Sequence, residues 1–136
     1  MHDVAVTRLY DVTTGYISQS NPCDFIIYKY PSILYLECKS VHGNTLNFKS
    51  DIRENQWESL LQYSKVKGVN AGIICWFIDN DITIYLDIND LQYLKEQGNK
   101  SFNIKKDIPS TIVYGKKRRV FFDYDLRSFL KEISYD

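Results

Sequence analysis

The sequence predicts one α/β domain over residues 1–136, with strands of mixed direction around an early helix. The length is that of a single domain, and 44% of the residues are apolar, so the chain can bury a real core. Residues 69–78, VNAGIICWFI, are almost continuously apolar, which is typical of a central strand buried on both faces. A helical pattern precedes this strand and strand-like runs flank both, which indicates a layered α/β arrangement.

The first part of the chain alternates strand and turn signals. Residues 4–10 read as a short strand and residues 13–22 as a loop. Residues 23–30 and 33–39 read as two strands, and the turn signal Pro31-Ser32 between them predicts a hairpin.

A helical pattern begins at Asp51, which is a suitable N-cap, and Gly68 is expected to end the helix. The apolar face of this helix is expected to carry Ile52, Trp57, Leu60, Leu61 and Tyr63. Beyond residue 78 we expect a turn at 79–81, a strand at 81–88, a helix at 89–98, strands at 111–115 and 116–124, and an amphipathic helix at 125–133.

The overall composition excludes several classes of protein. The formal net charge is zero, with 17 basic and 17 acidic residues, which argues against wholesale binding of nucleic acid by charge but leaves local patches open. No run approaches the ~20 apolar residues of a membrane span, and the N-terminus lacks the features of a signal peptide. The three dispersed cysteines fit free thiols. We therefore expect a cytoplasmic protein without membrane partners.

A charged cluster is predicted where the hairpin strands end. Strand residues alternate between faces, so Glu37 and Lys39 share one side and Cys38 faces the other. In a hairpin that turns at Pro31-Ser32, the numbers of paired positions sum to about 63. Asp24 should therefore lie beside Glu37 and Lys39.

Two adjacent carboxylates repel each other unless a cation lies between them. Mg²⁺ suits such a site because it takes a few carboxylate oxygens and keeps several waters. A nearby lysine can orient or deprotonate the activated water, and such a set suits attack on a phosphodiester. A solvated salt-bridge edge is the alternative interpretation, and spacing alone leaves both open.

The segment NPCDF, followed thirteen residues after its Asp by ECK, resembles the PD-(D/E)xK nuclease motif. More specifically, the chain resembles the RecU-type Holliday junction resolvases, including their bacteriophage relatives. The resemblance runs from about Val6 to Asp107 and includes TRLYD, YLECKS, GNTLNF and GVNAGIICWFI. It implies a restriction-endonuclease-like fold, a mixed β-sheet flanked by helices.

The resemblance also implies roles for individual residues. Asp24 and Glu37 would hold Mg²⁺ or Mn²⁺, together with the backbone carbonyl of Cys38. Lys39 would activate the water or stabilise the phosphate. Gln56, seventeen residues after Lys39, would assist the nucleophilic water or the scissile phosphate.

The chain departs from the family pattern in two places. Family members place a helix carrying a further Glu before the first strand, whereas this sequence begins at Met1 almost directly on that strand. We expect this helix to be absent and its Glu to be dispensable or supplied by a second chain. The link from Asp11 to Pro22 is also too short for the long projection of the bacterial resolvases.

Several basic residues are candidates for DNA contacts. The densest cluster is KKRR, in which Lys116, Lys117, Arg118 and Arg119 would neutralise phosphates or simply form a solvated strand end. Four lysines would extend this patch: Lys95, Lys100, Lys105 and Lys106. Lys49 and Arg53, near the helix start, would hold the strand being cut. His42 is either a phosphate donor or a plain loop histidine.

The function expected from the resemblance is that of a metal-dependent DNA endonuclease that resolves four-way junctions. Symmetric cutting requires two sites related by a two-fold axis, so a homodimer is expected. A phage-type protein would act in the host cytoplasm. Two alternatives remain: a homing, nicking or other endonuclease of the same fold, and a DNA-binding module that has lost catalysis.

Overall fold

The computed structural model describes residues 4–9, 12–14, 17–19, 23–109, 111–113, 115–118 and 121–124. A six-stranded sheet has the order β1-β4-β5-β7-β8-β10, and its strands are Val4–Arg8, Phe25–Lys29, Ser32–Val41, Val69–Phe77, Ile82–Asp87 and Thr111–Val113. Three two-stranded sheets pair β2 (Val12–Thr14) with β3 (Ile17–Gln19), β6 (Thr45–Asn47) with β9 (Ser101–Asn103), and β11 (Gly115–Arg118) with β12 (Phe121–Tyr124). The helices are α1 (Glu54–Ser64), the 3-10 turn η1 (Ile78–Asn80) and α2 (Ile88–Glu96).

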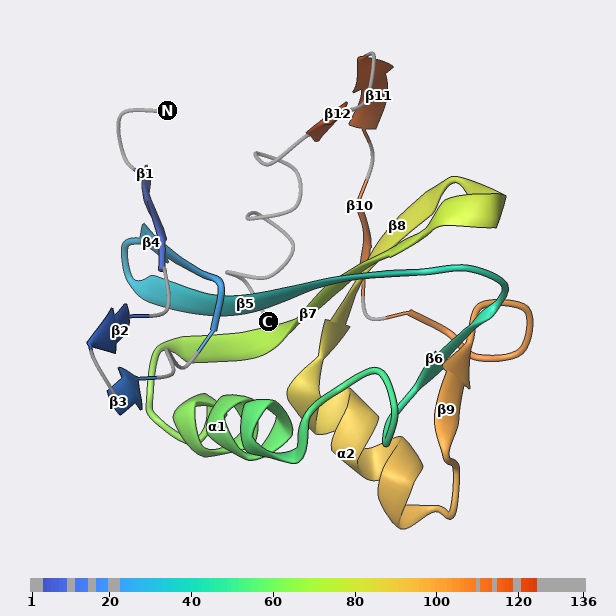
Figure 1. Ribbon diagram of the computed structural model, residues 1–136, viewed down its shortest axis with the longest axis horizontal. Helices are drawn as coiled ribbons and strands as arrows, with labels where there is room; N and C mark the ends of the chain where they lie inside the picture. The colour runs from blue at the N-terminus through green and yellow to red at the C-terminus, as the bar shows by residue number, and fades with distance from the viewer. Residues whose placement is uncertain are drawn as a thin grey trace.

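The main sheet is mixed because β5 and β7 run parallel, whereas its other neighbouring strands pair antiparallel. The chain returns from β5 to the start of β7 through β6 and α1. Figure 1 shows α1 and α2 on the same face of the sheet. The predicted α/β class, a mixed sheet flanked by helices, is confirmed. No helix in the described ranges is long and apolar enough to cross a membrane.

The sheet buries apolar side chains on both faces. Alternation along β5 places Tyr35 against the main core beneath the helices, whereas Leu34 and Leu36 belong to a smaller cluster on the opposite face. In β7, Ile73 lies in the main core and Ile74 packs against the smaller cluster. The predicted central strand therefore does contribute apolar residues to both faces. This two-sided packing fixes which side of β5 carries its charged residues.

The predicted hairpin is confirmed, with a small change of register. Phe25 pairs with Leu36, so the paired numbers sum to 61 instead of the expected 63. The difference arises because Lys29 pairs with Ser32, so the turn consists of Tyr30 and Pro31 instead of Pro31 and Ser32. The paired positions end at Phe25, one residue after Asp24.

The predicted start of the first helix is wrong. Arg53, not Asp51, is the N-cap, and the Asp51 carboxylate instead accepts a 2.6 Å hydrogen bond from the backbone N–H of Asn47. Asp51 therefore stabilises the turn before α1. The helix ends at Ser64, and Gly68 adopts a φ of +84° in the turn that leads into β7.

The ends of the chain also differ from expectation. Residues 116–124 were predicted as one strand, but β11 and β12 pair with each other as a hairpin. The predicted loop at 13–22 overlaps the short strands β2 and β3. The amphipathic helix predicted at 125–133 lies outside the described residues.

Gly72 in β7 is expected to tolerate no side chain. A Cβ atom there would meet the backbone carbonyl oxygen of Leu86 and carbons of the Tyr85 ring at 2.7 Å. Both belong to the neighbouring strand β8, so relief requires the sheet to shift. Gly72→Ala should lower the free energy of unfolding by about 1–3 kcal/mol or more, measured by urea denaturation.

Gly43→Ala is the matched control, because Gly43 has a positive φ of 78° but open space around it. It should cost only about 1 kcal/mol, from backbone strain alone. Equal losses in the two variants would contradict the predicted clash at Gly72.

Candidate active site

The hairpin brings Asp24 to the middle of β5. The Asp24 N–H donates to the Leu36 carbonyl at 3.0 Å, which holds Asp24 against β5 just before β4 begins. Its carboxylate Oδ2 accepts a 2.9 Å hydrogen bond from the backbone N–H of Cys38. Asp24 is thereby fixed against the strand that carries Glu37 and Lys39, as the sequence predicted.

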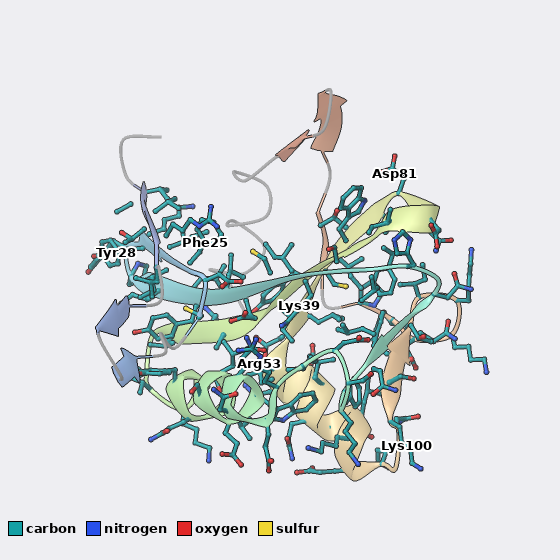
Figure 2. All side chains as sticks on the ribbon, in the orientation of Figure 1. Phe25, Tyr28, Lys39, Arg53, Asp81 and Lys100 are labelled. Carbon is teal, nitrogen blue, oxygen red and sulfur yellow. The ribbon has the colours of Figure 1, made fainter. Side chains whose placement is uncertain are left out.

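Gln56, the third residue of α1, joins this strand to the helix. Its side-chain Nε2 donates to Glu37 Oε1 at 2.9 Å, and its Oε1 accepts from Lys39 Nζ at 3.0 Å. The backbone N–H of Arg53 donates to the same Oε1 at 3.2 Å. In Figure 2, Lys39 and Arg53 lie between the sheet and α1. The structure thus brings all four predicted catalytic residues into one cluster.

Glu37 is the only charged residue that is buried within residues 4–9 and 23–109, with 5% of its surface exposed. Burial, and after it the nearby Asp24 carboxylate, raise the pKa of its carboxyl to about 7. Lys39 and Arg53 oppose the shift through their positive charges. The site therefore holds a carboxylate that lacks sufficient positive charge around it.

Lys39 lies at the edge of this buried group. Its Nζ is 4.0 Å from Glu37 Oε1, so its direct hydrogen bond goes to the Gln56 amide instead. About 20% of the Lys39 side chain is exposed, compared with 7% for Glu37. The ammonium is therefore held near the carboxylates while it stays accessible to a ligand from solvent.

The donor set fits Mg²⁺ better than a zinc-like site. In the described part of the chain, no three His, Cys, Asp or Glu side chains gather as a ready metal cage. Asp24 and Glu37 supply two carboxylates, and Mg²⁺ is commonly held by one or two carboxylates plus waters and substrate phosphates. A cation there would also relieve the repulsion that raises the pKa of Glu37.

The remaining candidates lie at different distances from the cluster. Arg53 contacts it, but through its backbone N–H, which sequence reasoning did not foresee. Lys49 lies in the turn before α1, where its N–H donates to Asn47 Oδ1 at 2.9 Å. His42 lies outside the cluster, because it follows the last residue of β5. Its Nδ1 is 3.1 Å from Oδ1 of Asp79, which belongs to η1.

The described part of the basic run is not brought to the acidic cluster. Lys116, Lys117 and Arg118 lie in β11, which pairs with β12, and Arg119 lies outside the described residues. Figure 1 shows β11 and β12 beyond β10, away from α1 and α2. Lys95 and Lys100, which were expected to extend this run, lie instead at the end of α2 and before β9.

Resemblance to known proteins is limited at the level of single proteins. No curated protein matches the sequence. Among solved structures, the chain resembles Archaeoglobus fulgidus Hjc, a Holliday junction resolvase from an archaeal hyperthermophile, with 15% identity and a TM-score of 0.46. The alignment covers 64% of this chain and 65% of the archaeal one, so the chain spans just under two thirds of that neighbour.

At the level of families the match is extensive. The sequence fits the family described as Recombination protein U, RecU, over residues 3–127. This range contains Asp24, Glu37, Lys39 and Gln56, and it includes every described strand and helix. The chain belongs to the RecU family.

Proposed function

We propose that this protein is a metal-dependent endonuclease that hydrolyses DNA at four-way junctions. The observation that carries the proposal is the cluster in which Gln56 joins the buried Glu37 to Lys39, with Asp24 beside them. A surface salt bridge would not require a desolvated carboxylate and a dedicated amide bridge. Membership of the RecU family and the resemblance to an archaeal resolvase point to the same substrate.

Each residue of the cluster has a proposed part in the reaction. Asp24 and Glu37 would hold Mg²⁺ or Mn²⁺. The Cys38 N–H faces Asp24, and both backbone groups of a strand residue point the same way, so the Cys38 carbonyl is a reasonable third ligand. Bound there, the cation would lower the pKa of water and neutralise charge on the phosphate.

The protein's own polar groups would position the reactants. The Lys39 ammonium would donate to the scissile phosphate or orient the attacking water, while Gln56 keeps it from collapsing onto Glu37. Burial of Glu37 would exclude bulk water from the reacting centre and strengthen these electrostatic contacts. Cutting both strands symmetrically would require a homodimer.

A second candidate is a nuclease of the same family fold that acts on another DNA structure. The short strands β2 and β3, of three residues each, favour it, because they leave little chain for a projection into a junction.

Cleavage should depend on the cluster. With Mg²⁺ or Mn²⁺, a labelled four-way junction should be cut by paired symmetric nicks. Lys39→Ala should slow cutting by about a hundredfold or more, because a positioned proton-transfer or charge-stabilising group is lost. Rates are read from denaturing gels beside a linear duplex of the same sequence.

Lys65→Ala, at the far end of α1, removes an equal charge and should cut like the wild type. Equal cutting of duplex and junction would favour the second candidate. A wild-type protein that binds the junction and cuts neither DNA would show that catalysis has been lost.

Glu37 should make stability depend on pH and on the metal. Without metal, folded Glu37 keeps its proton up to a pKa of about 7, whereas the unfolded carboxyl releases it near 4.5. The folded state therefore binds more protons in this window, so the free energy of unfolding should fall as pH rises from 4.5 to 7 and then level off. The loss should be on the order of 3 kcal/mol.

Glu37→Gln should remove this component of the pH dependence, as measured by urea unfolding in a chelator. Added Mg²⁺ should raise the melting temperature of the wild type most above pH 7, where the carboxylate is charged. A wild type and a variant with identical pH profiles would refute the assignment to Glu37.

A further inference from the structure

A hollow of about 600 Å³ lies on the helix-bearing side of the sheet, between the start of α1 and the end of α2. Figure 2 shows Lys100 on the same side of the sheet as Lys39 and Arg53. The hollow has the size of a small-ligand pocket. Its lining comes from the turn before α1, from α1 itself, from the end of α2 and from the segment that follows α2, and it includes Phe48, Lys49, Ile52, Trp57, Lys95 and Lys100.

The walls of the hollow are held together by backbone hydrogen bonds. The Phe48 N–H donates to the Lys100 carbonyl at 3.0 Å, which continues the pairing of β6 with β9. Asn47 Oδ1 accepts from the N–H groups of Lys49 and Ser50 at 2.9 and 3.0 Å. The two walls are thus tied to each other, so the hollow is formed before any ligand enters.

The hollow combines positive charge with apolar side chains, those of Phe48, Ile52 and Trp57, here called its floor. Lys49, Lys95 and Lys100 contribute three ammonium groups against the single carboxylate of Glu54. This local excess stands out in a chain of zero net charge. Lys95 Nζ lies 4.8 Å from the centre of the Trp57 ring, which keeps this charge at the hollow.

The floor is rigid as well as apolar. Trp57 packs against Phe48 with ring centres 5.1 Å apart, and its indole N–H donates to Gln92 Oε1 at 2.7 Å. Ile52 completes this floor and is 2% exposed. An apolar floor beside cationic groups matches a nucleotide, because the ring face of its base is apolar and its phosphate is an anion.

The hollow adjoins the catalytic cluster through α1. Gln56 faces β5 and Trp57, the next residue, faces α2, and the Cα atoms of consecutive residues are about 3.8 Å apart. A DNA strand that crosses the start of α1 would therefore meet both sites.

We propose that this hollow binds an unpaired nucleotide of the DNA strand that enters the catalytic cluster, with Lys49, Lys95 and Lys100 on its phosphates. The proposal rests on the proposed function, and it identifies the substrate as DNA that can release a base from its pair. Duplex phosphates alone need a basic surface and make no use of an apolar floor. Base stacking is interrupted at a branch point, so releasing a nucleotide from its pair costs less there than within a duplex.

Tryptophan resonances test occupancy of the hollow directly. The chain has two tryptophans, and Trp57 lines the hollow while Trp76 lies in β7. Titration of the ¹⁵N-labelled protein with a short oligothymidylate in a chelator should shift the Trp57 indole signal and leave that of Trp76 in place. A titration with inorganic phosphate should shift Trp57 much less. No shift of Trp57 at saturating oligothymidylate would overturn the proposal.

Charge-removing variants test the role of the lysines. Lys95→Gln with Lys100→Gln should weaken oligothymidylate binding about tenfold and lower its salt slope by about 1.4, two phosphate contacts of about 0.7 each. Lys65→Gln with Lys67→Gln, beyond the far end of α1, removes the same charge and should bind like the wild type. Equal binding by the two double variants would refute a specific role for the hollow.

Both tests measure binding without metal, so they are independent of cleavage. If the Trp57 shift and the lysine dependence appear but no DNA is cut, the binding proposal stands and the nuclease proposal fails. If the junction is cut through Lys39 while Trp57 stays unshifted, the reverse holds.

Discussion

The candidate active site depends on the side-chain amide of Gln56. This amide has one acceptor oxygen and one NH₂ group, and the cluster uses both: Oε1 faces the Lys39 ammonium and the Arg53 N–H, and Nε2 faces Glu37. A flipped amide would set NH₂ against two donors and oxygen against a carboxylate, so only one orientation is compatible with its neighbours. The spacing between the two charged side chains of β5 therefore depends on where α1 begins.

The start of α1 in turn depends on contacts that the sequence does not reveal. Asp51 looks like an N-cap because its carboxylate could accept helix N–H groups, but it bonds to the Asn47 N–H instead. The hairpin and β7 were predictable because alternation and continuous apolar runs are local patterns. The basic run was misread as one strand because no Gly or Pro marks a turn between β11 and β12.

The same contrast holds for the site. Alternation along β5 and the hairpin register were enough to gather Asp24, Glu37 and Lys39, because both are short-range features. Gln56 came only from family resemblance, since a loop and a small strand separate it from β5. Lys100 was grouped with the wrong cations, because its position follows from the pairing of β6 with β9 across more than fifty residues.

Burial of Glu37 costs stability, and the proposed metal-binding role would account for this cost. An apolar residue at this position would pack against the main core without the desolvation that raises the pKa of Glu37. The cluster supplies only part of the missing charge, because Gln56 holds the Lys39 ammonium 4.0 Å from the carboxylate. Under the proposed function a bound cation would supply the rest, and the free energy lost in burying the carboxylate would favour metal binding. The surrounding core keeps water from solvating the Glu37 carboxylate, so a bound ligand would have to compensate its charge.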